Sequence, residues 1–213
     1  MTAPEFDPGF VDRFDTLLRW RRDVRHFDPR PLSEAVIQGL LETAALAPSV
    51  GNAQPWRFVR IRSLLLRETI AAHVDDVSAK AASAIPDAVR RDRYRALKLH
   101  GILEAPELIA VFCDEDPDAG HKLGRITMPE MLRYSTVMAI HTLWLAARAR
   151  GIGLGWVSIL EPSVVTELLD VPPQWSLIAL LCLGYPLNPS DIPELERRGW
   201  QAREPVAVRT LER

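Results

Sequence analysis

Apolar side chains recur at helical spacing in three parts of the chain. They predict one helix that ends near Trp20, a second that follows Ser33 and ends before Pro48, and a long central helix over 127–151. Ser33 is a good N-cap residue, and Gly151 is typical of the position just after a helix end. The central helix carries apolar residues on more than one side, which predicts burial inside the domain or at a dimer contact.

Shorter apolar runs predict the strands. Residues 57–62 alternate apolar with basic side chains, as in a half-exposed strand, whereas 108–112 and 176–185 are mostly apolar and fit buried strands. The glycine-rich stretch 151–160 leads from the central helix into a further strand. Its glycines follow a helix and do not open one, so it is not a dinucleotide-binding fingerprint. The irregular alternation of helices and strands predicts an α+β fold with helices around one sheet.

The length of 213 residues predicts a single domain over 1–213. Within it we expect an irregular N-terminal arm over 1–10, a mostly solvated helical segment over about 75–100 that is a candidate lid, and a proline-punctuated C-terminal arm over about 187–213. The formal net charge of -2 argues against a nucleic-acid-binding protein. The chain shows neither an apolar run of the ~20 residues that span a bilayer nor a secretion signal, so we predict a cytoplasmic protein without a membrane partner.

The cysteines and the central histidine favour structural roles. Cys113 and Cys182 lie within apolar, strand-like runs and are predicted to be buried reduced thiols. His141 lies among apolar residues of the central helix, with no Cys, Asp or Glu at metal-binding spacing. We therefore predict a hydrogen-bonded core histidine and no metal site.

The most distinctive polar stretch, residues 21–27, follows the first predicted helix and is called the clasp below. Arg21, Arg22 and Arg25 bring three guanidinium groups close to one carboxylate, Asp23. Arginine donates two parallel hydrogen bonds to a phosphate and stays charged, which favours an anion-binding site. A self-paired charge cluster at a helix end is the alternative. Asp23 would repel an anion, so we expect it to orient the arginines or to take part in chemistry.

A second polar stretch, 47–56, is dense in proline, glycine and small polar residues and is predicted to be a loop. Ser49 and Asn52 are small enough to let backbone and side-chain donors approach a flat polar ligand. Taken alone, the stretch also fits an ordinary connection between a helix and a strand.

These motifs together resemble the FMN-dependent nitroreductase superfamily. The resemblance covers about 17–205 and rests on Arg-Arg-X-X-Arg-X-Phe, Pro-Ser-X-X-Asn-X-Gln-Pro-Trp, a Gly-X-Gly after the central helix, and Gly-Tyr-Pro before an arginine-bearing tail. Four stretches resemble its 5,6-dimethylbenzimidazole synthase branch: Arg-Arg-Asp-Val-Arg over 21–25, and the runs 134–137, 155–160 and 193–200. Typical nitroreductases carry serine where this chain has Asp23, whereas Asn52 is more typical of general nitroreductases.

The resemblance implies a nitroreductase-like α+β fold with a central mixed or antiparallel sheet. It also implies a homodimer in which extended arms wrap the partner and FMN lies at the interface. By the same resemblance, FMN would be bound by Arg21, Arg22, Asp23, Val24, Arg25, Ser158, Ile159 and Arg203, and by Ser49 and Asn52 of the partner chain.

The resemblance further implies that reduced FMN is the substrate. An oxygen-dependent and metal-free reaction would break it into 5,6-dimethylbenzimidazole, the lower ligand of cobalamin, and D-erythrose 4-phosphate, with a separate flavin reductase supplying the reduced flavin. Asp23 would act as a base or orient a water at the ribityl chain, its pKa lowered by the arginines, while Ser158 would hydrogen-bond at the ring edge. The alternatives are an NAD(P)H-dependent nitro- or quinone reductase with FMN, and a non-catalytic flavin-binding protein.

Overall fold

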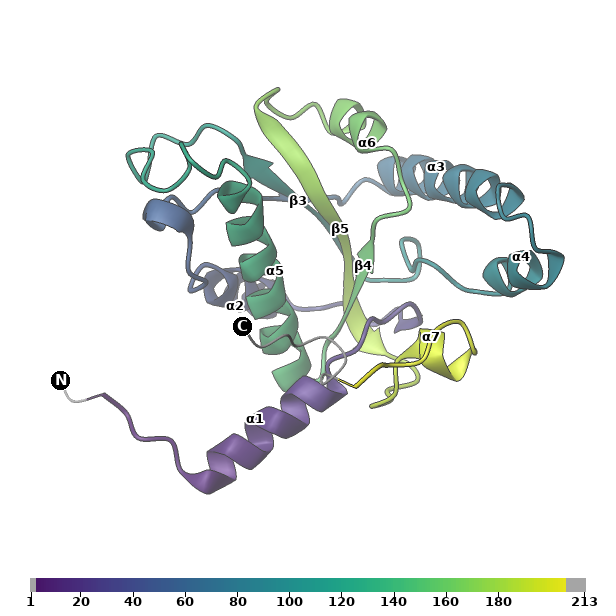
Figure 1. Ribbon diagram of the computed structural model, residues 1–213, viewed down its shortest axis with the longest axis horizontal. Coiled ribbons are helices and arrows are strands. Elements are labelled where there is room, and N and C mark those ends of the chain that lie inside the picture. Colours follow the sequence, from purple (N-terminus) through teal and green to yellow (C-terminus); the bar gives the residue numbers. More distant parts are fainter. Residues whose placement is uncertain (1–2, 206–213) are drawn as a thin grey trace, which may run out of the picture.

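The computed structural model describes residues 3–205 and contains one five-stranded sheet (Figure 1). Every strand pair in it is antiparallel, in the order β2-β3-β5, and both β1 and β4 pair with the other side of β5. The predicted α+β class with a central antiparallel sheet is confirmed. The strands are β1 (Phe27–Asp28), β2 (Trp56–Arg60), β3 (Glu107–Asp114), β4 (Gly153–Val157) and β5 (Trp175–Pro186).

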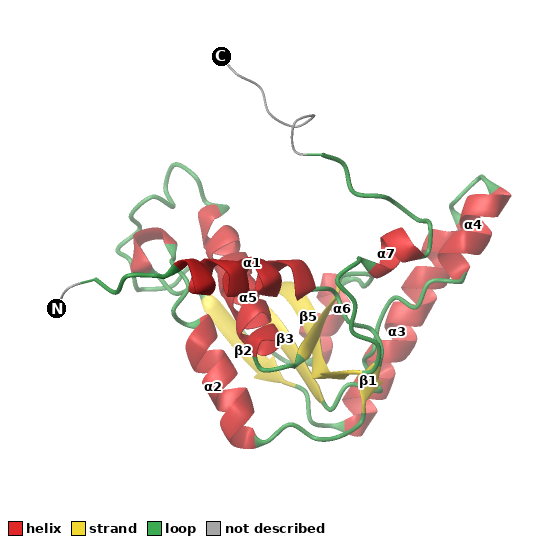
Figure 2. Cartoon of the chain, turned by 90° about the horizontal axis from the view of Figure 1, so that it is seen from below, coloured by secondary structure: helices red, strands yellow, loops and turns green. Residues whose placement is uncertain are grey.

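Helices cover both faces of the sheet. Figure 2 shows α2 and α5 on one face and α3 and α6 on the other. The helices are α1 (Pro8–Trp20), α2 (Glu34–Ala44), α3 (Leu64–Ser83), α4 (Ala88–Arg95), α5 (Met131–Ala149), α6 (Pro162–Leu168) and α7 (Glu194–Arg197), with a short 3-10 turn η1 (Val50–Asn52).

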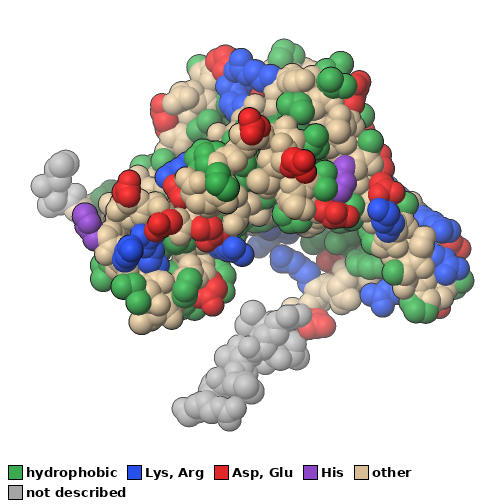
Figure 3. Space-filling model, turned by 90° about the horizontal axis from the view of Figure 1, so that it is seen from above, with side chains coloured by type: hydrophobic (Ala, Val, Ile, Leu, Met, Phe, Trp, Pro, Cys, Tyr) green, Lys and Arg blue, Asp and Glu red, His purple; other side chains and the backbone are tan. Residues whose placement is uncertain are grey.

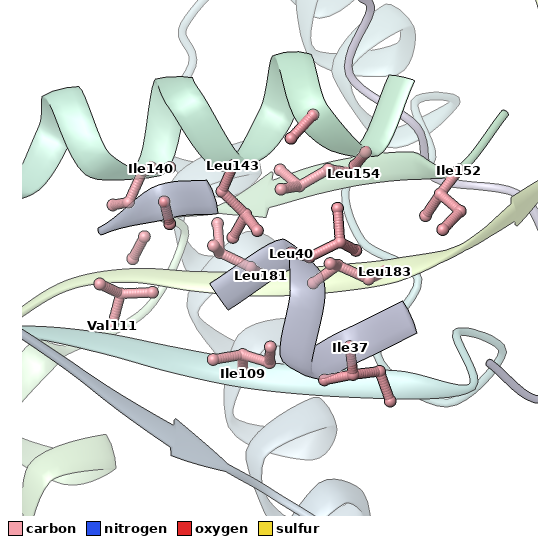
Figure 4. Close-up of a cluster of buried hydrophobic side chains, with 14 of the residues drawn as sticks. Ile37, Leu40, Ile109, Val111, Ile140, Leu143, Ile152, Leu154, Leu181 and Leu183 are labelled. Atoms are coloured by element: carbon pink, nitrogen blue, oxygen red, sulfur yellow. The ribbon is translucent and has the colours of Figure 1, made fainter. Parts of the chain in front are cut away.

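Strand alternation divides the buried side chains into two cores, because successive residues of a strand face opposite sides of the sheet. Ile109 and Leu181 pack beneath α2 and α5, as Figure 4 shows. Leu108 and Leu180 face the opposite core, which α3 and α6 complete. The central strands β3 and β5 are therefore buried on both faces, as their apolar runs predicted.

Three helix ends test the sequence signals directly. The Ser33 side chain accepts a hydrogen bond from the backbone N–H of Val36 at 3.3 Å, which confirms it as an N-cap. Gly151 follows α5 with φ +72°, as its C-terminal role requires. The N-terminus of α5 was predicted too early, because the helix begins only at Met131 and not at residue 127.

The irregular N-terminal arm is shorter than predicted. Helix α1 already begins at Pro8, and Asp7 caps it by accepting from the N–H of Phe10 at 2.6 Å. Aspartate followed by proline is a typical start, because proline is tolerated at the first helical position, where no intrahelical partner exists for its missing N–H. The prediction of an arm over 1–10 was therefore wrong from Pro8 onward.

The predicted helical segment over about 75–100 is made of the second half of α3 and the whole of α4. Ile70 and Val74 fix α3 to the core, whereas no residue of α4 is buried. Figure 3 shows Lys and Arg side chains gathered at the end of the molecule that α3 and α4 form. Whether this segment acts as a lid stays a prediction.

Cys113 and Cys182 are buried free thiols, as predicted, and burial raises their pKa values to about 11 and about 12. His141 is not a core histidine, because its side chain lies on the exposed face of α5. Within residues 3–205 no three His, Cys, Asp or Glu side chains group as a metal site. None of the helices in that range has the length and apolar character to cross a membrane.

Candidate functional site

The clasp leaves the end of α1 in extended form and lies along β4. Arg21 is the C-cap of α1, and the chain turns there to backbone angles of the β region. The N–H of Val24 donates to the carbonyl of Leu154 at 3.1 Å, and Asp23 forms a parallel bridge to the same residue. The clasp is thus one further strand-like segment at the edge of the sheet.

Two glycines make this contact possible. A Cβ at Gly155 would lie 2.0 Å from the carbonyl oxygen of Val24, and one at Gly153 would lie 2.8 Å from the Val24 side chain. The backbone of the clasp occupies the space that side chains would fill. Gly153 and Gly155, which follow the central helix, therefore allow the clasp to pack directly against β4.

Asp23 is held by two donors. One carboxylate oxygen accepts from the N–H of Trp156 at 2.8 Å, and the other accepts from Nε of Arg25 at 2.9 Å. Burial raises the pKa of Asp23, against the smaller lowering effects of Arg25, the Trp156 N–H and Arg21. Our expectation that the arginines lower this pKa was wrong in its net direction, since it left out the cost of burying a carboxylate.

The clasp lines a cavity of about 210 Å³ together with the C-terminal segment. Burial and the charge of Arg203 both lower the pKa of Arg21, whose guanidinium lies 4.6 Å from the centre of the Trp144 ring. The lining carries four arginines and two carboxylates, so it is net positive, and a bound anion would offset the repulsion between Arg21 and Arg203. Its lining residues are Arg21, Arg22, Asp23, Arg25, Pro193, Glu194, Leu195 and Arg203.

The other members of the clasp serve different contacts. Arg22 donates from Nε to the carbonyl of Asp191 at 2.7 Å, so it also ties the clasp to the C-terminal segment. Arg25 donates from Nη1 to the carbonyl of Lys98 at 3.1 Å, which links the clasp to the chain just after α4. The Val24 side chain faces Gly153 and not this cavity.

Ser158 and Ile159 follow the end of β4 directly. Ser158 is exposed, and Ile159 is half-buried. Ser158 stands two residues after Trp156, the backbone partner of Asp23, which is about 7 Å along an extended chain. Strand β4 therefore links both predicted catalytic positions: its Trp156 N–H holds Asp23, and its C-terminal end leads directly into Ser158.

The structure does not bring Ser49 and Asn52 to the clasp of the same chain. Their loop is fixed to the first turns of α5, where the N–H of Val50 donates to Oγ of Ser135 at 3.0 Å. The clasp lies at the last turns, where Trp144 Nε1 donates to the carbonyl of Arg22 at 3.3 Å. Ser135 and Trp144 are separated by about 14 Å along the helix axis. Figure 1 shows the two stretches at opposite ends of α5.

Comparison with known proteins identifies the family. The family model described as "Nitroreductase family" matches residues 18–185. This chain belongs to the nitroreductase family. It is 56% identical over 209 residues to the 5,6-dimethylbenzimidazole synthase of Rhodospirillum rubrum, covering 97% of this chain and 98% of that one. It is 50% identical over 201 residues to a 5,6-dimethylbenzimidazole synthase of Rhodobacter capsulatus, covering 94% and 97%.

A solved nitroreductase-like structure supports the same fold. An oxidized iodotyrosine deiodinase bound to FMN and 3-iodo-L-tyrosine matches this chain with a TM-score of 0.70 and 25% identity. The match covers 83% of this chain and 91% of that one.

Sequence reasoning missed one carboxylate at the cavity. Glu194 lines it and lies 3.7 Å from Nε2 of His26 and 3.6 Å from Nε of Arg198. In the run 193–200, two acidic residues, Glu194 and Glu196, precede two arginines and an arginine-bearing tail. This charge pattern is the signal that the run packs against other charged groups.

Proposed function

We propose that this member of the nitroreductase family is a 5,6-dimethylbenzimidazole synthase, which breaks down reduced FMN with molecular oxygen. The products include 5,6-dimethylbenzimidazole and D-erythrose 4-phosphate, and the remaining pyrimidine atoms of the flavin ring leave as a separate fragment. The benzimidazole serves as the lower ligand of cobalamin. The observation that carries the proposal is the Asp23 carboxylate, fixed between the Trp156 N–H and Arg25 at an arginine-lined cavity. The identity of 56% to a synthase supports it.

The cavity fits the phosphate of FMN. Arg21, Arg25 and Arg203 supply planar donors suited to phosphate oxygens, and Arg22 holds the C-terminal segment in place. A dianion there would offset the repulsion that lowers the pKa of Arg21. The flavin would then extend along β4, with the backbone of the clasp beside it and the ring near Ser158 and Ile159.

Asp23 suits the role of a general base at the ribityl chain. Each of its oxygens accepts one hydrogen bond from the protein and keeps a second lone pair for a hydroxyl or a water. Because burial raises its pKa, the ionised carboxylate is a stronger base than an exposed aspartate. When bound, the reduced flavin supplies the electrons for the reaction with oxygen. Ser158 donates or accepts one hydrogen bond at the ring edge.

The complete site requires a homodimer. Ser49 and Asn52 would approach the flavin from the partner chain, since their own clasp lies at the other end of α5. A two-fold axis places such separated halves together in two equivalent sites. Large apolar side chains on α1, on the segment just before it and on the exposed face of α5 offer the contact surface. They are Phe6, Phe10, Phe14, Leu18, Tyr134 and Val137.

The extended segments complete this proposal. The N-terminal segment through α1 and the C-terminal segment from residue 187 act as arms around the partner; residues 206–213 of the second arm lie outside the described part of the chain. The α3–α4 hairpin covers the flavin as a lid, linked to the clasp through Arg25 and Lys98. A separate flavin reductase supplies reduced FMN.

The direct test follows the fate of the flavin. The purified protein is mixed with chemically reduced FMN under argon, air is admitted, and the products are followed by chromatography and mass. We expect a benzimidazole peak that matches the loss of flavin. Full return of oxidised FMN would contradict the proposal. Repeated NADPH oxidation with a nitroaromatic acceptor would then indicate a reductase, and tight FMN binding without either reaction would indicate a flavin-binding protein.

Asp23→Asn tests the role of the carboxylate. We expect FMN binding to change little and product formation to fall about 100-fold or more, the usual contribution of a general base. Asp28→Asn is the control, because its carboxylate accepts from the nearby N–H of Arg30 and Asp28 lies in β1, just after the clasp. An unchanged product yield in Asp23→Asn would remove Asp23 from the mechanism.

A further inference from the structure

The connection 158–161 between β4 and α6 is held at both ends by backbone N–H groups that donate to side chains. On the β4 side, the N–H of Trp156 donates to Asp23 at 2.8 Å. On the α6 side, the N–H of Glu161 donates to Nε2 of His73 at 2.9 Å. Ser158 lies between these two hydrogen bonds, so both of them limit where its hydroxyl can lie.

His73 is attached to a rigid part of the molecule. It lies within α3, at a point where the neighbouring Ile70 and Val74 are fully buried against the sheet. Val165 of α6 belongs to the same buried cluster. The imidazole is therefore carried by an element whose position the core fixes, as a residue that orients a reacting group must be.

The hydrogen bond from Glu161 to His73 replaces a common local one. Glu161 is the N-cap of α6, and in a capping box the third helical residue is a Glu or Gln that accepts from the N-cap N–H. This chain has Val164 at that position. His73 supplies the missing acceptor from another helix, which requires a neutral ring with its proton on Nδ1.

We propose that His73 is a positioning residue for Ser158. It holds the far end of the connection 158–161 so that the Ser158 hydroxyl stays at the edge of the flavin ring, and it does not contact the flavin itself. This inference rests on the proposed function for the role of Ser158. The hydrogen bond to Glu161 can also be tested without any flavin.

The experiment compares His73→Leu, which removes the acceptor, with His73→Gln, which keeps one in the amide oxygen. Thr69→Val is the matched control, because it removes a side-chain hydrogen bond one turn earlier on α3, to the carbonyl of Leu65. The first readout is amide hydrogen exchange of the peptide 157–165 in the flavin-free protein. The second compares FMN affinity with the yield of 5,6-dimethylbenzimidazole.

For His73→Leu we expect exchange in this peptide to rise about three- to tenfold, the usual effect of one lost hydrogen bond. Product yield should fall by a similar factor while FMN affinity is unchanged, because the clasp is intact. His73→Gln and Thr69→Val should resemble the wild type in both readouts.

Exchange in His73→Leu at the wild-type rate would overturn the proposal. Equal losses of product yield in His73→Leu and His73→Gln would also overturn it. They would mean that the side chain acts only through packing, because His73→Gln keeps the hydrogen-bond acceptor. If the wild type leaves reduced FMN intact, the proposed function fails and with it the role at the flavin, whereas the exchange readout still decides whether His73 orders the connection.

Discussion

The two ends of α5 carry two polar stretches that differ in how they are held. At its C-terminal end, the clasp lies on Gly153 and Gly155 and is joined to β4 through backbone bonds. At its N-terminal end, the loop 47–56 is joined to α5 by the hydrogen bond from Val50 to Ser135. The clasp is part of the sheet edge, whereas the loop connects α2 to β2 and packs against the first turns of α5.

The two ends also differ in whether they line a cavity. The clasp presents arginines around a cavity that its own chain builds. The loop leaves Asn52 exposed with φ +55°, away from any cavity that the clasp lines. In the proposed homodimer each end would supply half of a site, because a two-fold axis would bring unlike ends together.

The largest effect on stability and on FMN binding is expected from Gly155→Ala, which disrupts the contact between the clasp and β4. The new methyl group would lie 2.0 Å from the carbonyl oxygen of Val24, so the clasp must leave β4. We expect a loss of about 3 kcal/mol in the free energy of unfolding, at the upper end for overpacking, and no detectable FMN binding. Urea unfolding and flavin fluorescence titration measure both.

Gly39→Ala is the control for this change. Nothing lies within 4 Å of a Cβ at Gly39, inside α2, so this substitution should stabilise the protein by up to about 1 kcal/mol. If Gly155→Ala behaved like Gly39→Ala, the clasp would not depend on its contact with β4.

Mixing two inactive variants tests whether the two ends complete each other. Arg21→Gln damages the clasp, and Asn52→Asp removes an amide donor from the loop while keeping a residue that tolerates positive φ. Each homodimer should lose product formation. After mild dissociation and mixing, random pairing restores one intact site in each heterodimer, about a quarter of all sites. Product formation that stays absent in the mixture would contradict a shared site.

The sequence predicted those parts of the site that depend on local signals. The clasp follows a helix whose end the apolar spacing located, and Ser33 and Gly151 carry cap preferences that act over a few residues. The start of α1 also has a local signature in the sequence, an aspartate N-cap at Asp7 followed by Pro8.

Non-local features were out of reach of pattern reasoning. The role of Gly155 depends on its contact with Val24, which is distant in sequence, and no spacing in the sequence predicts that contact. The direction of the Asp23 pKa shift depends on burial, which charge pattern does not report. His141 was placed in the core because its neighbours are apolar, but an α-helix turns 100° per residue and leaves it on the exposed face.

A smaller effect is expected from Ser135→Ala at the loop end. It removes the acceptor for the N–H of Val50 in a buried position, which costs about 1–3 kcal/mol when no water replaces it. The loop should loosen while the clasp stays in place. FMN affinity of the dimer should fall about three- to tenfold, as measured by titration. Ser83→Ala, which removes an exposed hydroxyl from α3, should leave affinity unchanged.

The smallest expected effect is a pH dependence of the free energy of unfolding, which should arise from Asp23 at the clasp end and not from the loop end. Because burial raises the pKa of Asp23 in the folded protein, the protonated form is favoured by folding. This contribution is complete below the unfolded value of 3.8 and is lost as the pH rises through the folded pKa. Relative to Asp23→Asn, the flavin-free wild type should therefore lose stability as the pH rises above 3.8, as urea midpoints would record. The difference between Ser49→Ala and the wild type should not depend on pH, since that end changes no titratable group. A wild type that gains relative stability as the pH rises would mean that Arg25 and Arg21 outweigh burial at the clasp, and Asp23 would then be a weaker base than the mechanism requires.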